Sequence, residues 1–212
     1  MLTAFTFSPF AENTYVVADD TTREAVVFDP GCYDQDEKET LSQFLNDNKL
    51  TLKDVWLTHA HLDHVFGCAY LKRKYGVKVY MHVNEQVILN DTPNRAAMYG
   101  LRGFESFEID GYLREGELLT LGGLLFEVRF VPGHAPGHIA FVNHADRYVI
   151  GGDVLFRESV GRTDFPFCSA ADLKKSITDQ LYTLPDNYTV YPGHMESTTI
   201  GYEKKHNPFV RG

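Results

Sequence analysis

Short runs of apolar residues, separated by glycines and polar turns, recur along the chain and predict β-strands. The runs are rich in valine and aromatic residues, which favour a pleated, half-buried backbone. They gather before residue 30 and after residue 116, and single strands lie within the more helical stretches that follow each group. The predicted strands are Thr3–Phe7, Tyr15–Ala18, Ala25–Phe28, Val55–Leu57, Val77–Met81, Glu117–Thr120, Leu124–Val131, Ile139–Asn143, Tyr148–Ile150 and Tyr188–Tyr191.

Apolar positions three and four residues apart predict helices between these strands. In one such segment Leu41, Phe44 and Leu45 share a face, and acidic residues occupy the first turn. The predicted helices are Glu37–Asn48, Leu62–Tyr75, Asn84–Leu89, Ala170–Leu184 and Ser197–Lys205. The order is β-rich, αβα, β-rich and αβα, which predicts two similar halves with facing sheets and helices outside.

Two segments, Asp91–Phe107 and Gly152–Phe167, show neither the strand pattern nor the helical spacing of apolar residues, and they are predicted as loops. The first is rich in aromatic side chains, which is typical of a lid, an interface, or a small cluster packed on a sheet edge. Its Arg95, Tyr99 and Arg102 are candidate substrate contacts, the arginines through a substrate carboxylate.

Composition narrows the class of protein. A length of 212 residues suits one domain, 1–212, and 43% hydrophobic residues can form a real core. The net charge of -9, without a basic run, argues against a nucleic-acid partner. No apolar stretch is long enough for a membrane span, and the first residues lack the features of a signal peptide. Three cysteines, an odd number, indicate a reducing compartment, so we expect a cytoplasmic protein.

The strongest chemical signal is the segment 58–64, which follows the predicted strand Val55–Leu57. His59 and His61 are two residues apart, so an extended backbone would place both imidazoles on one face. Asp63 and His64 follow where the chain turns into a helix, which would aim them at the same point. A solvated polar loop is the plain alternative.

Three further metal-ligand residues favour a site over a solvated loop. His134, Asp153 and His194 each follow a β-rich run and a glycine, so each is expected at a strand end. Asp29 also ends a strand, where it is either a turn residue or a carboxylate beneath the histidines, and the two roles are compatible.

Seven histidine and aspartate ligands exceed the needs of one tetrahedral ion, and thiolates are absent from the set. Two divalent metal ions are therefore the natural interpretation. Zinc, iron, manganese and nickel all suit such ligands. Two ions about 3.5–4 Å apart can share a hydroxide and polarise a substrate oxygen, which is hydrolytic chemistry.

The motif His59-x-His61-x-Asp63-His64, with His134, Asp153 and His194 downstream, resembles the metallo-β-lactamase superfamily. The segments 132–138, 151–156 and 161–166, and the closing stretch 199–209, resemble the single-domain glyoxalase II-like hydrolases. The resemblance implies an α/β fold, the αβ/βα four-layer sandwich, with the metal site along one edge.

The same resemblance implies a role for each ligand. His59, His61 and His134 would bind one metal ion, and Asp63, His64 and His194 the other. Asp153 would bridge the two ions, which are zinc by default, with iron or manganese as other choices. A bridging hydroxide would hydrolyse a small-molecule thioester such as an S-2-hydroxyacylglutathione, with Asp63 and Asp153 as the candidate catalytic carboxylates. A thiolate leaves without a dedicated general acid.

Around the ligands, four residues are candidates for supporting roles. These are Asp29, His138, which would orient the His134 loop, and Arg162 and Asp164, which would pin the loop after Asp153. One departure from glyoxalase II stands out. Only eighteen residues follow His194, so the C-terminal helical domain that binds glutathione in those enzymes is expected to be missing, and glutathione recognition does not follow from the resemblance.

Two other functions remain open. A mononuclear-iron persulfide dioxygenase would use His59, His134 and Asp153 as a facial triad with open positions for oxygen. A metal-binding protein without catalysis is a lesser alternative. A flavoprotein di-iron centre would instead have glutamate at position 61, the commonest zinc β-lactamases would have a cysteine near Asp153, and an RNA-processing nuclease would need a basic surface. The oligomeric state is not predicted.

Overall fold

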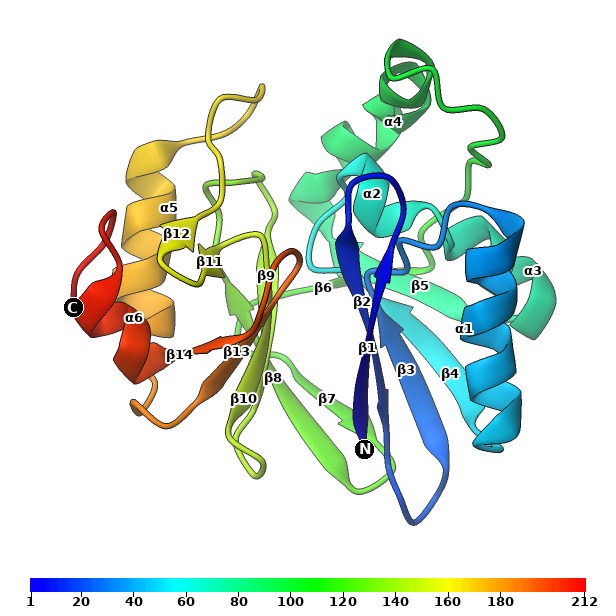
Figure 1. The fold of residues 1–212 in the computed structure, drawn as a ribbon, viewed down its shortest axis with the longest axis horizontal. Coiled ribbons are helices and arrows are strands. Elements are labelled where there is room, and N and C mark those ends of the chain that lie inside the picture. Colours follow the sequence, from blue (N-terminus) through cyan, green and yellow to red (C-terminus); the bar gives the residue numbers. More distant parts are fainter. The chain divides into compact units, whose positions relative to one another are not determined.

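The computed structural model describes residues 1–212, which form two compact units. The first comprises Met1–Tyr112 with Leu121–Leu124, and the second Leu113–Thr120 with Leu125–Gly212. Each unit is built on a six-stranded mixed sheet with helices along one side of it, as Figure 1 shows. None of the helices is both long and apolar enough to cross a membrane.

The first sheet has its six strands in sequence order. Strands β1, β2 and β3 are antiparallel, and β3, β4 and β5 are parallel. Because Phe28 on β3 is level with Trp56 on β4, the chain leaves both strands at the same edge, which is where Asp29 and the histidine segment follow. The strands are β1 Leu2–Phe7, β2 Glu12–Ala18, β3 Glu24–Phe28, β4 Thr51–Trp56, β5 Lys78–His82 and β6 Gly111–Leu113.

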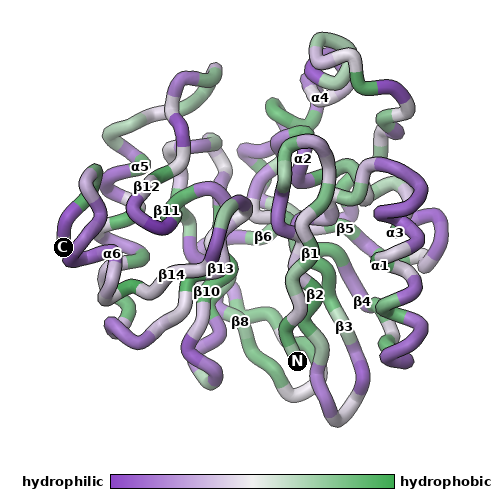
Figure 2. Tube along the Cα trace, in the orientation of Figure 1, coloured by the Kyte–Doolittle hydropathy of each residue, from purple (hydrophilic) through white to green (hydrophobic).

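Helices of the first unit cover a core of fully buried aliphatic residues that includes Val27, Leu41, Val55, Leu71 and Val79. They are α1 Gln35–Asp47, α2 Leu62–Val65, α3 Cys68–Tyr75, a 3₁₀ turn at Val83–Glu85, and α4 Gln86–Met98. Helix α1 starts with a capping box, in which the Asp34 side chain accepts from the backbone of Glu37 and the Glu37 side chain accepts from the backbone of Asp34. In Figure 2 most of α1 is hydrophilic, and the helix contributes Leu41 and Leu45 to the core.

The second sheet runs in the order β14, β13, β10, β9, β8, β7. Strands β10 and β13 are parallel neighbours, with Gly152 level with Pro192. Asp153 and His194 therefore leave adjacent strands at the same edge. The strands are β7 Leu118–Leu121, β8 Leu124–Phe130, β9 Ile139–Asn143, β10 Tyr148–Gly152, β13 Thr189–Pro192 and β14 Thr198–Thr199, and a separate hairpin pairs β11 Leu155–Phe156 with β12 Ser159–Val160.

Three helical segments complete the second unit. They are α5 Ala170–Ser176, a π-helical stretch at Ile177–Leu181, and α6 Ile200–His206. Val149, Val190, Ile177 and Ile200 are fully or almost fully buried where these helices meet the sheet.

The structure corrects several predicted elements. The expected helix Leu62–Tyr75 is two helices, because Gly67 lies against the segment of the chain that follows β3. A Cβ at Gly67 would stand 2.4 Å from the Cys32 sulfur, and its N–H donates to the carbonyl of Pro30 at 2.7 Å. The expected loop Gly152–Phe167 contains the hairpin β11–β12, and Ala170–Leu184 is α5 followed by the π-helical stretch.

The prediction of an irregular segment at Asp91–Phe107 is wrong in its first half. Helix α4 continues to Met98 with Pro93 inside it. Burial of Leu89 and Ala96 offsets the cost of a proline in the helix, and the Thr92 hydroxyl donates to the carbonyl of Ile88 at 3.1 Å. Regular structure is absent only from Leu101 to Asp110.

Candidate metal centre

The first unit brings three histidines together after β4. His59 and His64 are fully buried, and the His59 ring centroid lies 4.7 Å from that of His61 and 4.1 Å from that of His64. Asp63 stands beside them, with Oδ2 4.0 Å from Nε2 of His64 and with 18% of its side chain exposed. The extended backbone through His61 and the short helix α2 produce this convergence, as the residue spacing predicts. Histidines packed this closely, with a carboxylate at their edge, form a set of donors for a divalent metal ion.

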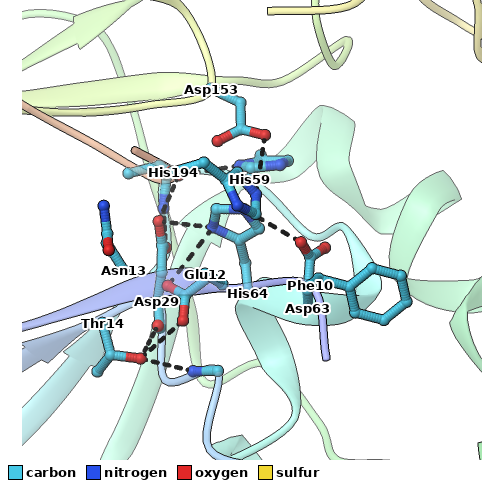
Figure 3. Close-up of polar contacts among 12 residues, drawn as sticks. Phe10, Glu12, Asn13, Thr14, Asp29, His59, Asp63, His64, Asp153 and His194 are labelled. Atoms are coloured by element: carbon cyan, nitrogen blue, oxygen red, sulfur yellow. Dashed lines mark hydrogen bonds and ion pairs between the residues drawn. The ribbon is translucent and has the colours of Figure 1, made fainter. Parts of the chain in front are cut away.

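Asp29 lies beneath this group and connects the ends of β3 and β4. Its Oδ1 accepts from the backbone N–H of Thr58 at 2.7 Å, and its Oδ2 accepts from the Thr58 hydroxyl at 2.6 Å. The same Oδ2 lies 3.1 Å from Nδ1 of His64 (Figure 3). The backbone of Asp29 is left-handed, with φ 46°, a conformation that aspartate tolerates better than most residues.

These contacts fix the tautomers of two imidazoles. The Thr58 hydroxyl donates its one hydrogen bond to Asp29. It therefore accepts a hydrogen bond from Nδ1 of His59, 3.0 Å away. His64 likewise directs Nδ1 at a carboxylate. In both rings the Nε2 lone pair is then available for a metal, the usual arrangement for a histidine ligand. Asp29, His59 and His64 also form a possible metal triad by distance, but the carboxylate oxygens of Asp29 already accept these hydrogen bonds, so Asp29 orients the ligands.

Two buried glutamates near the site were missed by the sequence analysis. Glu12 opens β2 and is fully buried. Its Oε2 accepts from the Thr14 hydroxyl at 2.8 Å, and its Oε1 lies 4.0 Å from Nδ1 of His64 (Figure 3). Burial raises the pKa of the Glu12 carboxyl well above its usual value, and the nearby His64 opposes that rise only in part.

The second glutamate, Glu85, is also fully buried and accepts from the backbone N–H of Ala60 at 2.8 Å. Ala60 lies between His59 and His61 in the sequence, so this hydrogen bond holds the backbone that carries both imidazoles. No short motif in the sequence marks either glutamate.

The second unit brings together His134, Asp153 and His194. The Oδ2 atom of Asp153 lies 3.5 Å from Nε2 of His134 and 3.6 Å from Nε2 of His194. One carboxylate oxygen is therefore flanked by two imidazole nitrogens. Nδ1 of His134 donates to the backbone carbonyl of Arg162 at 2.9 Å, which leaves Nε2 as the donor atom for a metal.

His138 and Gly161 both lie against the backbone of Asp153, His138 at its N–H and Gly161 at its carbonyl oxygen. Nε2 of the fully buried His138 accepts from the backbone N–H of Asp153 at 3.0 Å. Gly161 packs so closely on the Asp153 carbonyl oxygen that a Cβ would stand 1.9 Å from it, so only glycine fits there.

The remaining candidates from the sequence lie outside this donor set. Arg162 and Asp164 form a two-pronged ion pair, with contacts of 2.7 and 2.6 Å, and this pairing lowers the pKa of the Asp164 carboxyl to about 2. Thus it is the backbone of Arg162, rather than its guanidinium, that supports His134. Arg95 pairs with Asp91 within its own helix at 2.8 Å.

Of the other two substrate candidates, Tyr99 is 55% exposed and places its ring edge-on to Phe10, with centroids 5.5 Å apart. Arg102 accepts from the Tyr33 hydroxyl through its backbone carbonyl at 2.8 Å. Tyr99 and Arg102 are thus both exposed, whereas Arg95 is only partly exposed and is paired with Asp91.

The donor residues fit a divalent metal site. The first unit offers three imidazoles and one carboxylate, and the second offers two imidazoles and one carboxylate. In three of the five imidazoles, those of His59, His64 and His134, Nδ1 is directed at an oxygen atom. Such preset orientation is typical of metal-binding histidines and exceeds what a solvated loop requires.

Comparison with known proteins identifies a family of metal-dependent proteins, which is consistent with these metal-binding side chains. The family described as the metallo-beta-lactamase superfamily matches residues 8–194. The chain belongs to this superfamily. Hydroxyacylglutathione hydrolase GloC of Haemophilus influenzae is 38% identical over 203 residues, which cover 95% of this chain and 93% of that protein. The family and the histidine–aspartate clusters identify a metal-dependent hydrolase.

Solved structures show the same fold. The BLEG-1 B3 metallo-beta-lactamase gives a TM-score of 0.91 at 34% identity, with both chains fully covered. TTHA1623, solved in a di-iron-bound form, gives 0.87 at 34% identity over 98% of this chain and all of its own. ETHE1 from Myxococcus xanthus gives 0.81 at 30% identity over 98% of this chain and 83% of its own. The predicted fold class is therefore confirmed.

Proposed function

We propose that this chain is a dinuclear metal-dependent thioesterase that hydrolyses an S-2-hydroxyacylglutathione or a related small-molecule thioester. The observation that carries the proposal is the position of Asp153, whose Oδ2 lies 3.5 and 3.6 Å from the Nε2 atoms of His134 and His194. A carboxylate oxygen between two metal-binding imidazoles is the arrangement that a bridging ligand needs. The similarity to GloC supports the choice of substrate class.

In this proposal His59, His61 and His134 would hold one ion, Asp63, His64 and His194 would hold the other, and Asp153 would be a ligand of both. When bound, the two ions would supply a hydroxide nucleophile at neutral pH and Lewis-acid stabilisation of the developing oxyanion. The di-iron form of TTHA1623 shows that a protein similar over its whole length holds two metal ions. Zinc remains the default metal here, and iron is the principal alternative.

Hydrogen bonds within the protein orient the proposed metal ligands. Asp29 and Thr58 keep the Nε2 atoms of His59 and His64 deprotonated and aimed. His138 holds the backbone of Asp153. As metal ligands, Asp63 and Asp153 would not serve as a general acid, and a thiolate leaving group does not require one.

In this proposal the substrate contacts residues at the edge of the first unit. Tyr99 presents an exposed ring, whereas Arg95 is engaged by Asp91. We therefore assign the main substrate contacts to Tyr99 and Arg102, which are both exposed, and a smaller share of binding to Arg95.

A persulfide dioxygenase is the second candidate function, and the similarity to ETHE1 favours it. It needs one iron held by His59, His134 and Asp153. The contact between Asp29 and His64 favours the dinuclear hydrolase, because a mononuclear site made of His59, His134 and Asp153 does not include the imidazole at position 64.

Metal content and two activities measured on one sample test the proposal. The chain is purified without added metal, its metals are counted, and thiol release from S-D-lactoylglutathione and oxygen uptake with glutathione persulfide are recorded. About two metals per chain with thiol release is the expected result. About one iron with oxygen uptake would transfer the function to persulfide oxidation.

A matched pair of variants shows whether the activity belongs to this site. His61→Ala is expected to lose metal and thiol release together. His144→Ala, at a histidine that contacts Glu127 and Tyr188, should keep both. Full activity in His61→Ala with unchanged metal content would overturn the proposal.

A further inference from the structure

Glu203 is a buried acidic residue that lies away from the donor set. It lies on α6 and is fully buried. A buried carboxyl group is costly unless its oxygens accept hydrogen bonds, and each oxygen of Glu203 does so. The two oxygens accept from two different segments of the chain, and each of these segments carries a proposed metal ligand.

One oxygen holds the segment that follows His194. Oε1 of Glu203 accepts a hydrogen bond from the hydroxyl of Thr198, which is itself buried. Thr198 lies four residues after His194, and it pairs with Val190 where β14 joins β13. The short connection 195–197 is thus fixed at both ends, on one side by β13 and on the other by Glu203.

The other oxygen holds the segment that follows Asp153. Oε2 of Glu203 accepts from the backbone N–H of Glu158 at 3.0 Å. Glu158 forms the tight turn of the β11–β12 hairpin with a left-handed backbone, φ 54°, a conformation that is unfavourable for glutamate unless the turn is held from outside. Figure 1 shows this hairpin beside α6.

The hairpin returns the chain to Asp153. The N–H of Gly161, just past β12, donates to the carbonyl of Val154 at 3.2 Å, and Gly161 packs on the Asp153 carbonyl oxygen. A shift of the hairpin turn would therefore move the backbone of Asp153.

Asn207 completes the connection between α6 and the hairpin. Its side-chain amide donates to Oε2 of Glu203 at 2.9 Å and to the carbonyl of Ser159 at 3.0 Å. Asn207 is fully buried as well. The carboxyl and the amide thus hold both sides of the hairpin turn from one helix.

We propose that Glu203 is a positioning residue for the metal centre, which sets the two ligands Asp153 and His194 at once. The inference rests on the proposed roles of these two residues as ligands. It differs from a merely structural role, in which Glu203 would only fasten α6 to the unit and would leave metal affinity untouched.

Equilibrium Zn²⁺ binding to the full chain, measured in competition with a chromophoric chelator, tests the inference. Glu203→Ala is expected to weaken Zn²⁺ binding about tenfold or more, as loss of a group that orients metal ligands does, and to speed Zn²⁺ loss to the chelator. Glu203→Gln should recover most of the affinity, because its amide oxygen can still accept from Glu158 and Asn207, while the Thr198 hydroxyl can turn to accept from the amide.

Tyr182→Phe is the matched structural control. The Tyr182 hydroxyl donates to the carbonyl of Val210 at 2.7 Å in the same core, and this contact involves neither the hairpin nor the His194 segment. The control should lower the melting temperature and keep the Zn²⁺ affinity of the wild type. A Glu203→Ala protein that behaves in the same way would overturn the inference.

If Glu203→Ala does not fold, Thr198→Val takes its place. Thr198→Val removes only the contact on the His194 side and should weaken Zn²⁺ binding severalfold. Wild-type affinity in Thr198→Val would then overturn the inference. A wild-type chain that binds Zn²⁺ but releases no thiol from the thioester would defeat the proposed function, while the affinities of the variants would still decide the role of Glu203.

Discussion

Oδ2 of Asp29 lies 3.1 Å from Nδ1 of His64, although 35 residues separate the two in the chain. The contact exists because parallel pairing puts the ends of β3 and β4 at the same edge of the sheet. Asp29 therefore has two roles. Its backbone forms a tight turn, and its carboxylate sets the tautomer of His64, a proposed metal ligand.

Replacing Asp29 by asparagine is expected to weaken metal binding by about 10–100-fold, the usual effect of losing such a carboxylate. The amide nitrogen or oxygen would face Nδ1 of His64 without the negative charge that favours its N–H form. Zn²⁺ affinity and metal content check this. Asp19→Asn is the control, since Asp19 accepts from the backbone N–H groups of Thr21 and Thr22 in a distant turn and should affect stability alone. Equal affinities in the two variants would contradict the role of Asp29.

Asp153→Asn is expected to reduce metal occupancy from about two ions to one or fewer and to lower thiol release more than a hundredfold. An amide cannot bridge two cations as a carboxylate does. The fold should survive, because the backbone N–H of Asp153 still donates to His138. Metal analysis and the melting temperature of the metal-free protein give the two readouts. Two tightly held metals in the variant would remove Asp153 from the bridging position.

The convergence of His59, His61 and His64, and of His134, Asp153 and His194, could be predicted from the sequence because each residue follows a strand. Strands that run in the same direction end at the same edge of a sheet, so residues just past their ends lie close together. In the second unit β8 and β10 both run antiparallel to β9, and β13 is parallel to β10. The breaks in the pattern have equally physical causes. The kink at Gly67 depends on the approach of Cys32, and the continuation of α4 through Pro93 depends on burial that the local sequence does not encode.

The buried glutamates escaped prediction for a related reason. Every residue of β2 is buried, so inward and outward positions are not distinguished by polarity, and Glu12 looks like the polar edge of an ordinary strand. Glu85 lies in a 3₁₀ turn that the periodicity does not detect. Glu203 reads as a surface residue of a short helix, and only the tertiary fold brings Thr198 and Glu158 to it.

The raised pKa of Glu12 predicts how the stability of the metal-free protein depends on pH. Below the usual value of 4.5 the carboxyl is protonated in both the folded and the unfolded chain. Above 4.5 the unfolded chain releases the proton while the folded chain keeps it, so the free energy of unfolding falls as pH rises from 4.5 to the raised pKa. Glu12→Gln has no proton to release, and it should be more stable than the wild type at pH 7 by about 1 kcal/mol or more.

Urea denaturation of the metal-free proteins at pH 4.5 and pH 7 measures this difference, which should shrink at the lower pH. Glu39→Gln, at an exposed position of α1, serves as the control for the same substitution at the protein surface. A constant difference between Glu12→Gln and the wild type at both pH values would mean that burial does not govern this carboxyl.

Tyr99 offers a way to separate substrate binding from packing. Its ring is 55% exposed and meets Phe10 edge-on, so Tyr99→Ala removes both a packing contact and the surface assigned to the substrate. If the ring contacts the thioester, KM should rise about three- to tenfold with little change in kcat, since a contact made equally in the ground and transition states affects KM alone. If the ring only packs on Phe10, the variant should lose about 1 kcal/mol of stability and keep its KM.

Steady-state kinetics with S-D-lactoylglutathione, together with the melting temperature, distinguish the two. Leu125→Ala, at another exposed apolar residue, controls for the loss of surface area. A rise in KM confined to Tyr99→Ala would place the substrate at the edge of the first unit.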